Sequence, residues 1–310
     1  MDANVLVETK NLSREEWLEC RKMGIGGSDV AGILGISKWS SPISIWLDKT
    51  GQADPVEENE AMRWGTILEP VVRDHFAETT GKVVKEVKAI LQHPEYPFML
   101  ANVDGITTDD EGNPAILEIK TASEYVKDEW LVHIPLYYLT QVQHYLCVTG
   151  LAKAYIAVLI GGNCFRIYEL EADFELHQML IAVERDFWNK VENSIRPDID
   201  GTNASKALLD ELYTGGNKEE VVLPDEAETW IDAYLTASAD EDSAKMRKQE
   251  ASNHIKELMG NNENAIFQSH KISWKSVSTE RLDTKLLKTE EPQLYEKYVK
   301  ETNSRRFTIK

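Results

Sequence analysis

Two carboxylates and a lysine lie close together around a predicted β-hairpin. Asp104 ends one predicted strand, and Glu118 and Lys120 lie on the strand that follows it. Side chains alternate along a strand, so Glu118 and Lys120 share one face, while Ile119 points into the core and keeps its backbone carbonyl as a neutral oxygen ligand. Two carboxylates with a carbonyl between them suit a hard divalent cation such as Mg²⁺. A lysine beside them can orient or deprotonate an attacking water and offset the charge that develops on a phosphate.

An ordinary solvated strand face is the alternative interpretation of this pattern, because Glu-X-Lys triplets are frequent in an acidic chain. The neighbouring Ile116, Leu117 and Ile119 are apolar, which predicts a buried strand. A glutamate and a lysine that are buried together need partners or a metal ion. The sequence therefore favours a site for metal-assisted hydrolysis.

Further blocks of sequence stand in a fixed order around this hairpin. They are Arg21 to Asp29 (RKMGIGGSD), Trp64-Gly65 with Glu69, Asn102 to Gly105 (NVDG), Glu118 to Lys120 (EIK), and Gln141 to Gln143 (QVQ) with Tyr145. In these blocks the chain resembles the YqaJ-type viral recombinase family, the group that contains phage lambda exonuclease, within the PD-(D/E)XK nuclease superfamily. The resemblance spans roughly residues 14–195. Val103 replaces the proline that names the superfamily, at a position that serves only packing.

The resemblance implies a role for each residue of the metal site. Asp104 and Glu118, with the Ile119 carbonyl, correspond to the metal ligands, and Lys120 corresponds to the lysine that positions the nucleophile. Glu69 resembles the family's additional helical acid near the metals, and an exposed helix charge is the alternative. The implied cofactor is Mg²⁺, with Mn²⁺ able to substitute, as two ions about 4 Å apart.

The resemblance also implies a site for the DNA end. Arg21 and Ser28 match the pair that holds the terminal 5′-phosphate, since Arg21 offers a bidentate fork and Ser28 a hydroxyl beside a glycine-rich turn. Asn102 and Gln141 fall where the family places further polar contacts to the DNA end or the attacking water. A structural amide is the alternative for each of these two residues.

The implied fold is an α/β restriction-endonuclease-like core, a mixed central β-sheet flanked by helices, with a small α+β C-terminal appendage. The implied function is 5′-to-3′ digestion of double-stranded DNA ends by a homotrimeric ring, which leaves a 3′ single strand for a single-strand annealing protein. Two alternatives are a structure- or site-specific endonuclease on the same fold and a catalytically idle DNA-binding or assembly module. An iron–sulfur nuclease is disfavoured because it needs four clustered cysteines, and the chain has three.

The net charge of −19 counts against tight binding to duplex DNA, which usually requires a basic surface. A closed ring would provide processivity without such a surface. Residues 265–310 nevertheless hold ten Lys and Arg against six Asp and Glu. Their basic residues alternate with aromatics such as Trp274 and Tyr298, which predicts stacking on single-stranded DNA or docking of an acidic partner. A small appendage that uses the aromatics as its own core is the third possibility.

The hydrophobic pattern predicts the elements that position these residues, in a nuclease domain over 1–200 and a helical and hairpin extension over 201–310. Ser13 and Glu16 predict a capping box, and Gly81 predicts the end of a long helix. The expected helices are 13–19, 30–34, 43–49, 61–80, 137–148, 173–194, 223–259 (one helix or a helical pair) and 294–298. The expected strands are 83–90, 98–106, 115–120, 154–160, 164–169, 265–267, 271–274 and 306–309, and 52–59 is expected to be a polar linker.

The sequence predicts a cytoplasmic protein, and the resemblance implies a bacterial host and a phage or prophage origin. The N-terminal segment lacks the apolar core of a signal peptide. The longest apolar stretch, 154–160, is too short to cross a bilayer, so no membrane contact is expected. Three widely spaced cysteines suggest reduced thiols.

Overall fold

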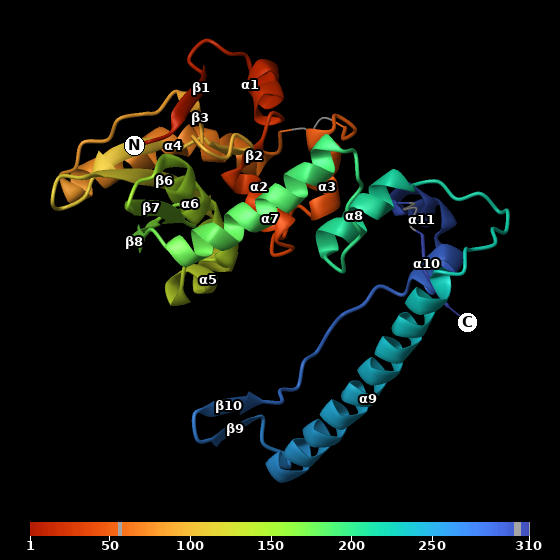
Figure 1. Cartoon of the computed structure of the whole chain (residues 1–310). Coiled ribbons are helices and arrows are strands. Elements are labelled where there is room, and N and C mark those ends of the chain that lie inside the picture. The colour runs from red at the N-terminus through yellow and green to blue at the C-terminus, as the bar shows by residue number, and fades with distance from the viewer. Residues whose placement is uncertain (55–57, 301–304, 310) are drawn as a thin grey trace. The chain divides into compact units, whose positions relative to one another are not determined.

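The computed structural model describes residues 1–54, 58–300 and 305–309, and it contains two compact units, Met1–Leu212 and Tyr213–Lys310 (Figure 1). The predicted division after residue 200 would assign helix α8 (Asn203–Leu212) to the extension, whereas α8 contacts α3 (Pro42–Lys49) and belongs to the first unit. Part of the expected linker, residues 55–57, lies outside the described residues. No helix among the described residues has the length and apolar character needed to span a membrane.

Two four-stranded sheets form the framework of the first unit. One has the order β1-β3-β4-β2, with β1 (Asn4–Glu8), β3 (Ala89–Gln92), β4 (Met99–Ala101) and β2 (Ile25–Gly26). The other has the order β5-β6-β7-β8, with β5 (Gly105–Thr108), β6 (Pro114–Ala122), β7 (Lys153–Ile160) and β8 (Cys164–Glu171). Strands β6 and β7 are parallel, and the other neighbours in this sheet are antiparallel. The predicted α/β class, with mixed sheets and flanking helices, is confirmed.

Alternating residues of β6 face two different helices. Ile116 packs in a core with Val142 and Leu146 of α6 (Leu136–Thr149), while Leu117 packs with Phe76 of α4 (Glu60–Thr80). Glu118 and Lys120 have the parity of Ile116 and therefore face α6. The remaining helices of this unit are α1 (Arg14–Arg21), α2 (Gly27–Ile33), α5 (Lys127–Val132) with the short 3₁₀ helix η1 (Glu124–Val126), and α7 (Phe174–Glu192).

Local sequence signals fix two of these helices as predicted. The Ser13 hydroxyl accepts a hydrogen bond from the Glu16 N–H, and the Glu16 carboxylate accepts one from the Ser13 N–H, which completes the capping box of α1. Helix α4 ends at Gly81, whose φ of 70° lies in the left-handed region that glycine tolerates without strain. The hairpin between β5 and β6 also forms as predicted, with Thr108 opposite Pro114.

Two predicted strands are wrong in extent. The expected strand 98–106 is broken into β4 and β5, which belong to different sheets, so Asp104 does not end a strand but precedes β5. The expected strand 83–90 is reduced to Ala89–Gln92 with one isolated bridge at Lys85. Two residues in the first half of the expected strand contact side chains instead. The Val83 carbonyl accepts a hydrogen bond from the Thr107 hydroxyl, and Glu86 forms an ion pair with Arg73.

A buried ionisable pair joins α6, α7 and β4. His144 Nδ1 lies 2.9 Å from Glu184 Oε1, and Nε2 lies 2.8 Å from the Leu100 carbonyl, to which it must donate. Burial alone would lower the pKa of His144, but the carboxylate of Glu184 outweighs it and the pKa is raised. For the carboxyl group of Glu184, burial has the opposite effect and raises the pKa. The folded pair therefore keeps a proton that the unfolded chain releases as the pH rises above about 6.5, the ordinary pKa of histidine, so its contribution to stability falls as the pH rises.

The second unit contains one long helix and a hairpin. Helix α9 (Ala227–Met259) is a single helix rather than a pair, and β9 (Asn264–Phe267) and β10 (His270–Ser273) are antiparallel. Two short helices follow, α10 (Thr284–Glu290), which was not predicted, and α11 (Pro292–Tyr298). The predicted strand 306–309 is wrong, because the described residues there pair with no strand. Phe307 instead contacts the Tyr234 ring, with centroids 5.5 Å apart.

Candidate active site

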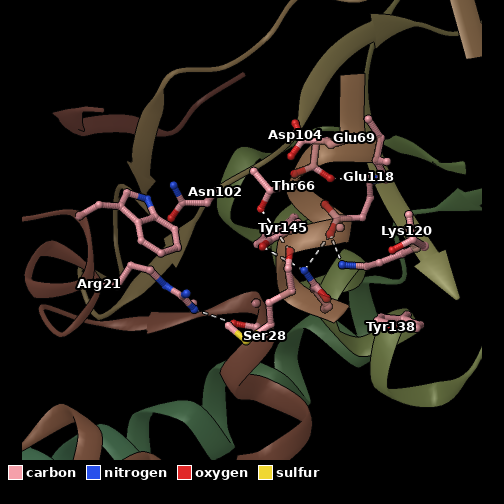
Figure 2. A pocket seen from close by; sticks show the side chains of 18 residues that line it. Arg21, Ser28, Thr66, Glu69, Asn102, Asp104, Glu118, Lys120, Tyr138 and Tyr145 are labelled. Carbon is pink, nitrogen blue, oxygen red and sulfur yellow. Dashed lines mark hydrogen bonds and ion pairs between the residues drawn. The ribbon is translucent and has the colours of Figure 1, made fainter. Parts of the chain in front are cut away.

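One cavity of about 480 Å³ in the first unit collects every site residue predicted from the sequence (Figure 2). These residues are Arg21, Ser28, Glu69, Asn102, Asp104, Glu118, Ile119, Lys120 and Gln141. They come from six elements or their junctions, namely α1, α2, α4, β6, α6 and the segment between β4 and β5. Figure 2 shows the carboxylates gathered on one side of the cavity and Arg21 with Ser28 on the other.

Glu118 is the most constrained carboxylate of the cavity. Its Oε1 accepts hydrogen bonds from Lys120 Nζ at 2.6 Å and from Gln141 Nε2 at 2.8 Å. The residue is 2% exposed, and its Oε2 is buried with no hydrogen-bond partner among the described residues. A buried carboxylate oxygen without a donor is costly, so this oxygen is suited to a cation.

Asp104 lies where the chain passes from one sheet to the other. Its Oδ2 accepts a hydrogen bond from the Ile119 N–H at 2.7 Å. The N–H and C=O of one strand residue point to the same edge, so the Ile119 carbonyl is directed to the edge that Asp104 occupies. Burial, reinforced by the negative charge of Glu118, raises the pKa of Asp104 to about 7. The two acids and the carbonyl thus concentrate oxygen ligands at one point.

Lys120 is held as a cation in this surrounding. Burial alone would lower the pKa of Lys120, but the negative charges of Glu118 and Asp104 outweigh it and the pKa is raised. The ammonium group lies 4.9 Å from the ring centroid of Tyr138, over its face. In this arrangement Lys120 places a positive charge beside Glu118 and Asp104.

Glu69 reaches the cavity from α4 and brings a basic partner that the sequence analysis missed. Arg73, one helical turn further on, forms ion pairs with both Glu69 and Glu86. Burial and the proximity of Asp104 raise the pKa of Glu69, against the effect of Arg73. The spacing of four residues between Glu69 and Arg73 was a usable signal for this pair.

Arg21 and Ser28 form the opposite side of the cavity. Arg21 Nη2 donates a hydrogen bond to Ser28 Oγ at 2.6 Å, and the guanidinium lies 4.8 Å from the ring centroid of Trp17. Asn102 lines the same cavity. Trp17 was not predicted as a site residue; it precedes Arg21 by four positions in α1 and therefore shares its face.

Gln141 is tied to the protein by its amide nitrogen. Besides the bond to Glu118, Gln141 Nε2 donates to the Tyr145 hydroxyl at 3.1 Å. Both amide protons are thus used by protein groups, which places Gln141 as a support of Glu118. Tyr145, a residue of the predicted motif for which no site role was expected, lies one helical turn away and lines the cavity.

The residues of the cavity fit a magnesium site that is completed by water and substrate. Among the described residues, no three His, Cys, Asp or Glu side chains are grouped closely enough to hold an ion by themselves. Magnesium commonly binds one or two carboxylates and retains waters and phosphate oxygens as its other ligands. Asp104, the free Oε2 of Glu118 and the Ile119 carbonyl provide such a partial set.

Comparison with known proteins identifies the family. Residues 16–152 match the YqaJ-like viral recombinase domain. The chain is 44% identical over 315 residues to the uncharacterized protein YqaJ of Bacillus subtilis (strain 168), covering 99% of this chain and 98% of that protein. The chain therefore belongs to the YqaJ-like viral recombinase family, which confirms the resemblance found in the sequence.

Solved structures with a similar course of the chain are more distant. LHK-Exo, an alkaline exonuclease from Laribacter hongkongensis, is 20% identical with a TM-score of 0.48, over 64% of this chain and 98% of that chain. A phage-related exonuclease from Haemophilus somnus 129PT is 12% identical with a TM-score of 0.43, over 56% of this chain and 96% of that chain.

Proposed function

We propose that this protein is a divalent-metal-dependent deoxyribonuclease of recombination that digests one strand of duplex DNA from its 5′ end and leaves a 3′ single strand. The observation that supports it best is the state of Glu118, whose Oε1 is fixed by two donors while its buried Oε2 has no partner in the described structure. Membership of a viral recombinase family supports a role in recombination.

The chain's own groups have separate tasks in this proposal. Asp104, Glu118 and the Ile119 carbonyl hold Mg²⁺ or Mn²⁺, and Glu69 helps to hold a second ion. Bound divalent ions activate a water and stabilise the leaving oxygen of the phosphodiester. Lys120 directs its ammonium group, 2.6 Å from Glu118 Oε1, at the attacked phosphate and offsets the developing charge.

The far side of the cavity selects the DNA end. Arg21 offers the guanidinium N–H groups that its single bond to Ser28 leaves free, and these match the oxygens of a terminal 5′-phosphate. The exposed hydroxyl of Ser28 and the amide of Asn102 add polar contacts from neighbouring elements. The distance between Arg21 and the carboxylates of Asp104 and Glu118 then decides which phosphodiester, counted from the 5′ end, lies at the metal ligands.

A homotrimeric ring would explain processive digestion by an acidic protein. Trp64, Ile67 and Val71 follow each other at helical spacing on α4 and are 53%, 47% and 57% exposed. We assign this apolar stripe to contacts between copies. Light scattering checks this: Trp64→Glu should lower the oligomer mass, and an unchanged mass would remove the stripe from the interface.

Two further proposals concern the setting of the reaction. The partner is a single-strand annealing protein, and the protein acts in a bacterial cytoplasm.

Gel assays with three substrates test the proposal. Linear duplexes with 5′-phosphate or 5′-hydroxyl ends and a covalently closed circle are incubated with Mg²⁺ or with a chelator. Digestion should require the metal, prefer the 5′-phosphorylated duplex and spare the circle. Efficient cutting of the circle would favour the endonuclease alternative, and equal digestion in excess chelator would contradict the metal site.

A further inference from the structure

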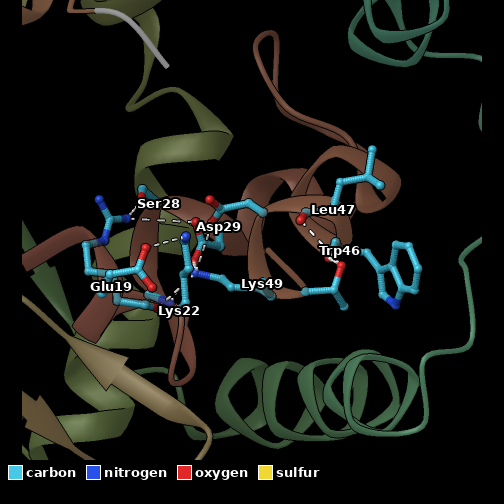
Figure 3. A network of polar contacts seen from close by, with 11 residues as sticks. Glu19, Lys22, Ser28, Asp29, Trp46, Leu47 and Lys49 are labelled. Carbon is cyan, nitrogen blue, oxygen red and sulfur yellow. Dashed lines mark hydrogen bonds and ion pairs between the residues drawn. The ribbon is translucent and has the colours of Figure 1, made fainter. Parts of the chain in front are cut away.

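A buried lysine outside the cavity, Lys49, lies beside Asp29 (Figure 3). The Lys49 side chain, at the end of α3, is 1% exposed and does not line the cavity. Its Nζ lies 2.7 Å from Asp29 Oδ2 and donates a hydrogen bond to the Arg21 carbonyl at 3.1 Å. Asp29 Oδ2 also accepts a hydrogen bond from the Gly26 N–H at 2.9 Å. Lys49 therefore touches both the acid beside the proposed end-binding site and the backbone of its arginine.

Arg21 itself is held only weakly by that acid. Its Nη2 lies 3.9 Å from Asp29 Oδ1, at the limit of an ion pair, and instead donates to the neutral hydroxyl of Ser28 at 2.6 Å. Burial alone would raise the pKa of Asp29, but Lys49 and then Arg21 outweigh it and the pKa is lowered. Asp29 is thus an anion whose nearer cation is Lys49.

We propose that Lys49 is a positioning residue for Arg21: it neutralises Asp29 and fixes the Arg21 backbone, so that the guanidinium stays free to bind an anionic ligand. The identity of the ligand as a 5′-phosphate of DNA rests on the proposed function. A buried carboxylate without a partner is strongly unfavourable. Without Lys49, Asp29 would recruit the nearest remaining cation, which is Arg21, and would compete with the phosphate for it.

Two variants separate this role from a structural one. Lys49→Met keeps the length of the side chain and removes its charge, which leaves Asp29 to compete for Arg21. Lys49→Met/Asp29→Asn removes both charges, and the asparagine oxygen can still accept the Gly26 N–H. Lys82→Met is the matched control, because Lys82 forms a Lys–Asp ion pair of 2.6 Å with Asp110 and does not line the cavity.

The measurement is the ratio of Kd values for duplexes with 5′-hydroxyl and 5′-phosphate ends, obtained with the full chain in chelator so that no hydrolysis occurs. Wild type and Lys82→Met should prefer the phosphorylated end, and Arg21→Ala should not. Lys49→Met should lower the ratio by about tenfold or more, the usual effect of losing a hydrogen bond to a charged group. The double variant should return the ratio to within about threefold of wild type, since its Arg21 is free again.

The idea is overturned if Lys49→Met keeps the wild-type ratio, if the double variant binds as poorly as the single one, or if wild type does not distinguish the two ends. A Lys49 that only supports the fold would weaken binding of both ends equally and leave the ratio unchanged. Should Lys49→Met fail to fold, the double variant decides alone. A Kd ratio of the double variant near that of wild type supports the proposal, and a ratio as low as that of Arg21→Ala contradicts it. Hydrolysis with Mg²⁺ is measured separately, so absence of nuclease activity would refute the proposed function and leave the end preference intact.

Discussion

Replacement of Gln141 by leucine tests how helix α6 supports Glu118, one of the carboxylates that we propose as metal ligands. Gln141 Nε2 donates to Glu118 Oε1 at 2.8 Å and to the Tyr145 hydroxyl at 3.1 Å. Leucine has a similar volume and no polar atom, so the variant leaves Lys120 as the remaining donor to Glu118 Oε1. The Glu118 carboxylate then has more freedom to rotate its second oxygen away from the proposed cation position.

The size of the effect follows from the bond that is lost. A hydrogen bond to a charged group contributes about 1.5–3 kcal/mol, which corresponds to roughly 10- to 150-fold in an equilibrium constant. Loss of a group that orients a metal ligand typically lowers metal affinity by about 10- to 100-fold. We expect the Mg²⁺ concentration for half-maximal hydrolysis to rise by about that factor, while the rate at saturating Mg²⁺ stays within about threefold of wild type.

Initial rates on a 5′-phosphorylated duplex over a range of Mg²⁺ concentrations provide the assay, and Mn²⁺ binding followed by electron paramagnetic resonance gives a second measurement. Gln143→Leu is the control, because Gln143 bonds to the Glu171 carbonyl and His177 instead of the site. It should lower stability without shifting the metal midpoint. An unchanged midpoint for Gln141→Leu together with a lost rate at saturation would refute the reasoning and place Gln141 on the reacting atoms.

Three further predictions concern the carboxylates, the buried pair and the second unit. Asp104→Asn should lower hydrolysis by more than the roughly 10- to 100-fold typical of a lost outer-shell group, without changing circular dichroism, since it removes a proposed direct ligand; a normal rate would exclude Asp104. Glu184→Gln lets its amide donate to a neutral His144, so urea denaturation from pH 6 to 8 should show the variant gaining stability relative to wild type, by at most about 1.4 kcal/mol per pH unit; a constant difference would contradict the shared proton. Truncation after Leu212 should leave a folded nuclease with lower processivity and a flatter salt dependence if the second unit contacts DNA; unchanged processivity with loss of the annealing partner would favour docking.

The core of the candidate site could be predicted because its geometry is local. The alternation of side chains along one strand places Glu118 and Lys120 on a common face, and a turn rich in Asp, Gly and Asn pairs that strand with the segment that follows Asp104. The capping box at Ser13 and the glycine at the end of α4 likewise act within a few residues. Such signals need no knowledge of the rest of the fold.

Other parts could not be predicted because they depend on distant contacts. Apolar residues on both sides of Asn102 and Asp104 favoured a single strand over 98–106, whereas the pairing of β4 with β3 and of β5 with β6 shows that the segment changes sheets. The sequence around Lys49 predicts an ordinary exposed lysine at the end of a helix. Its burial arises because α3 packs near Asp29. The strand expected over 306–309 had the right composition, but the described residues offer it no partner strand.

The distribution of charge explains how an acidic chain can have a site for an anionic substrate. Three acids of the region each have a basic neighbour: Lys120 beside Glu118, Arg73 beside Glu69 and Lys49 beside Asp29. These pairs leave little free positive charge, and among the described basic residues that line the cavity Arg21 alone lacks a close carboxylate. Under the proposed function, capture of DNA then depends on divalent cations at the carboxylates and on one arginine at the end, rather than on a basic surface. Few phosphate contacts imply a shallow dependence of binding on salt, which is compatible with a net charge of −19.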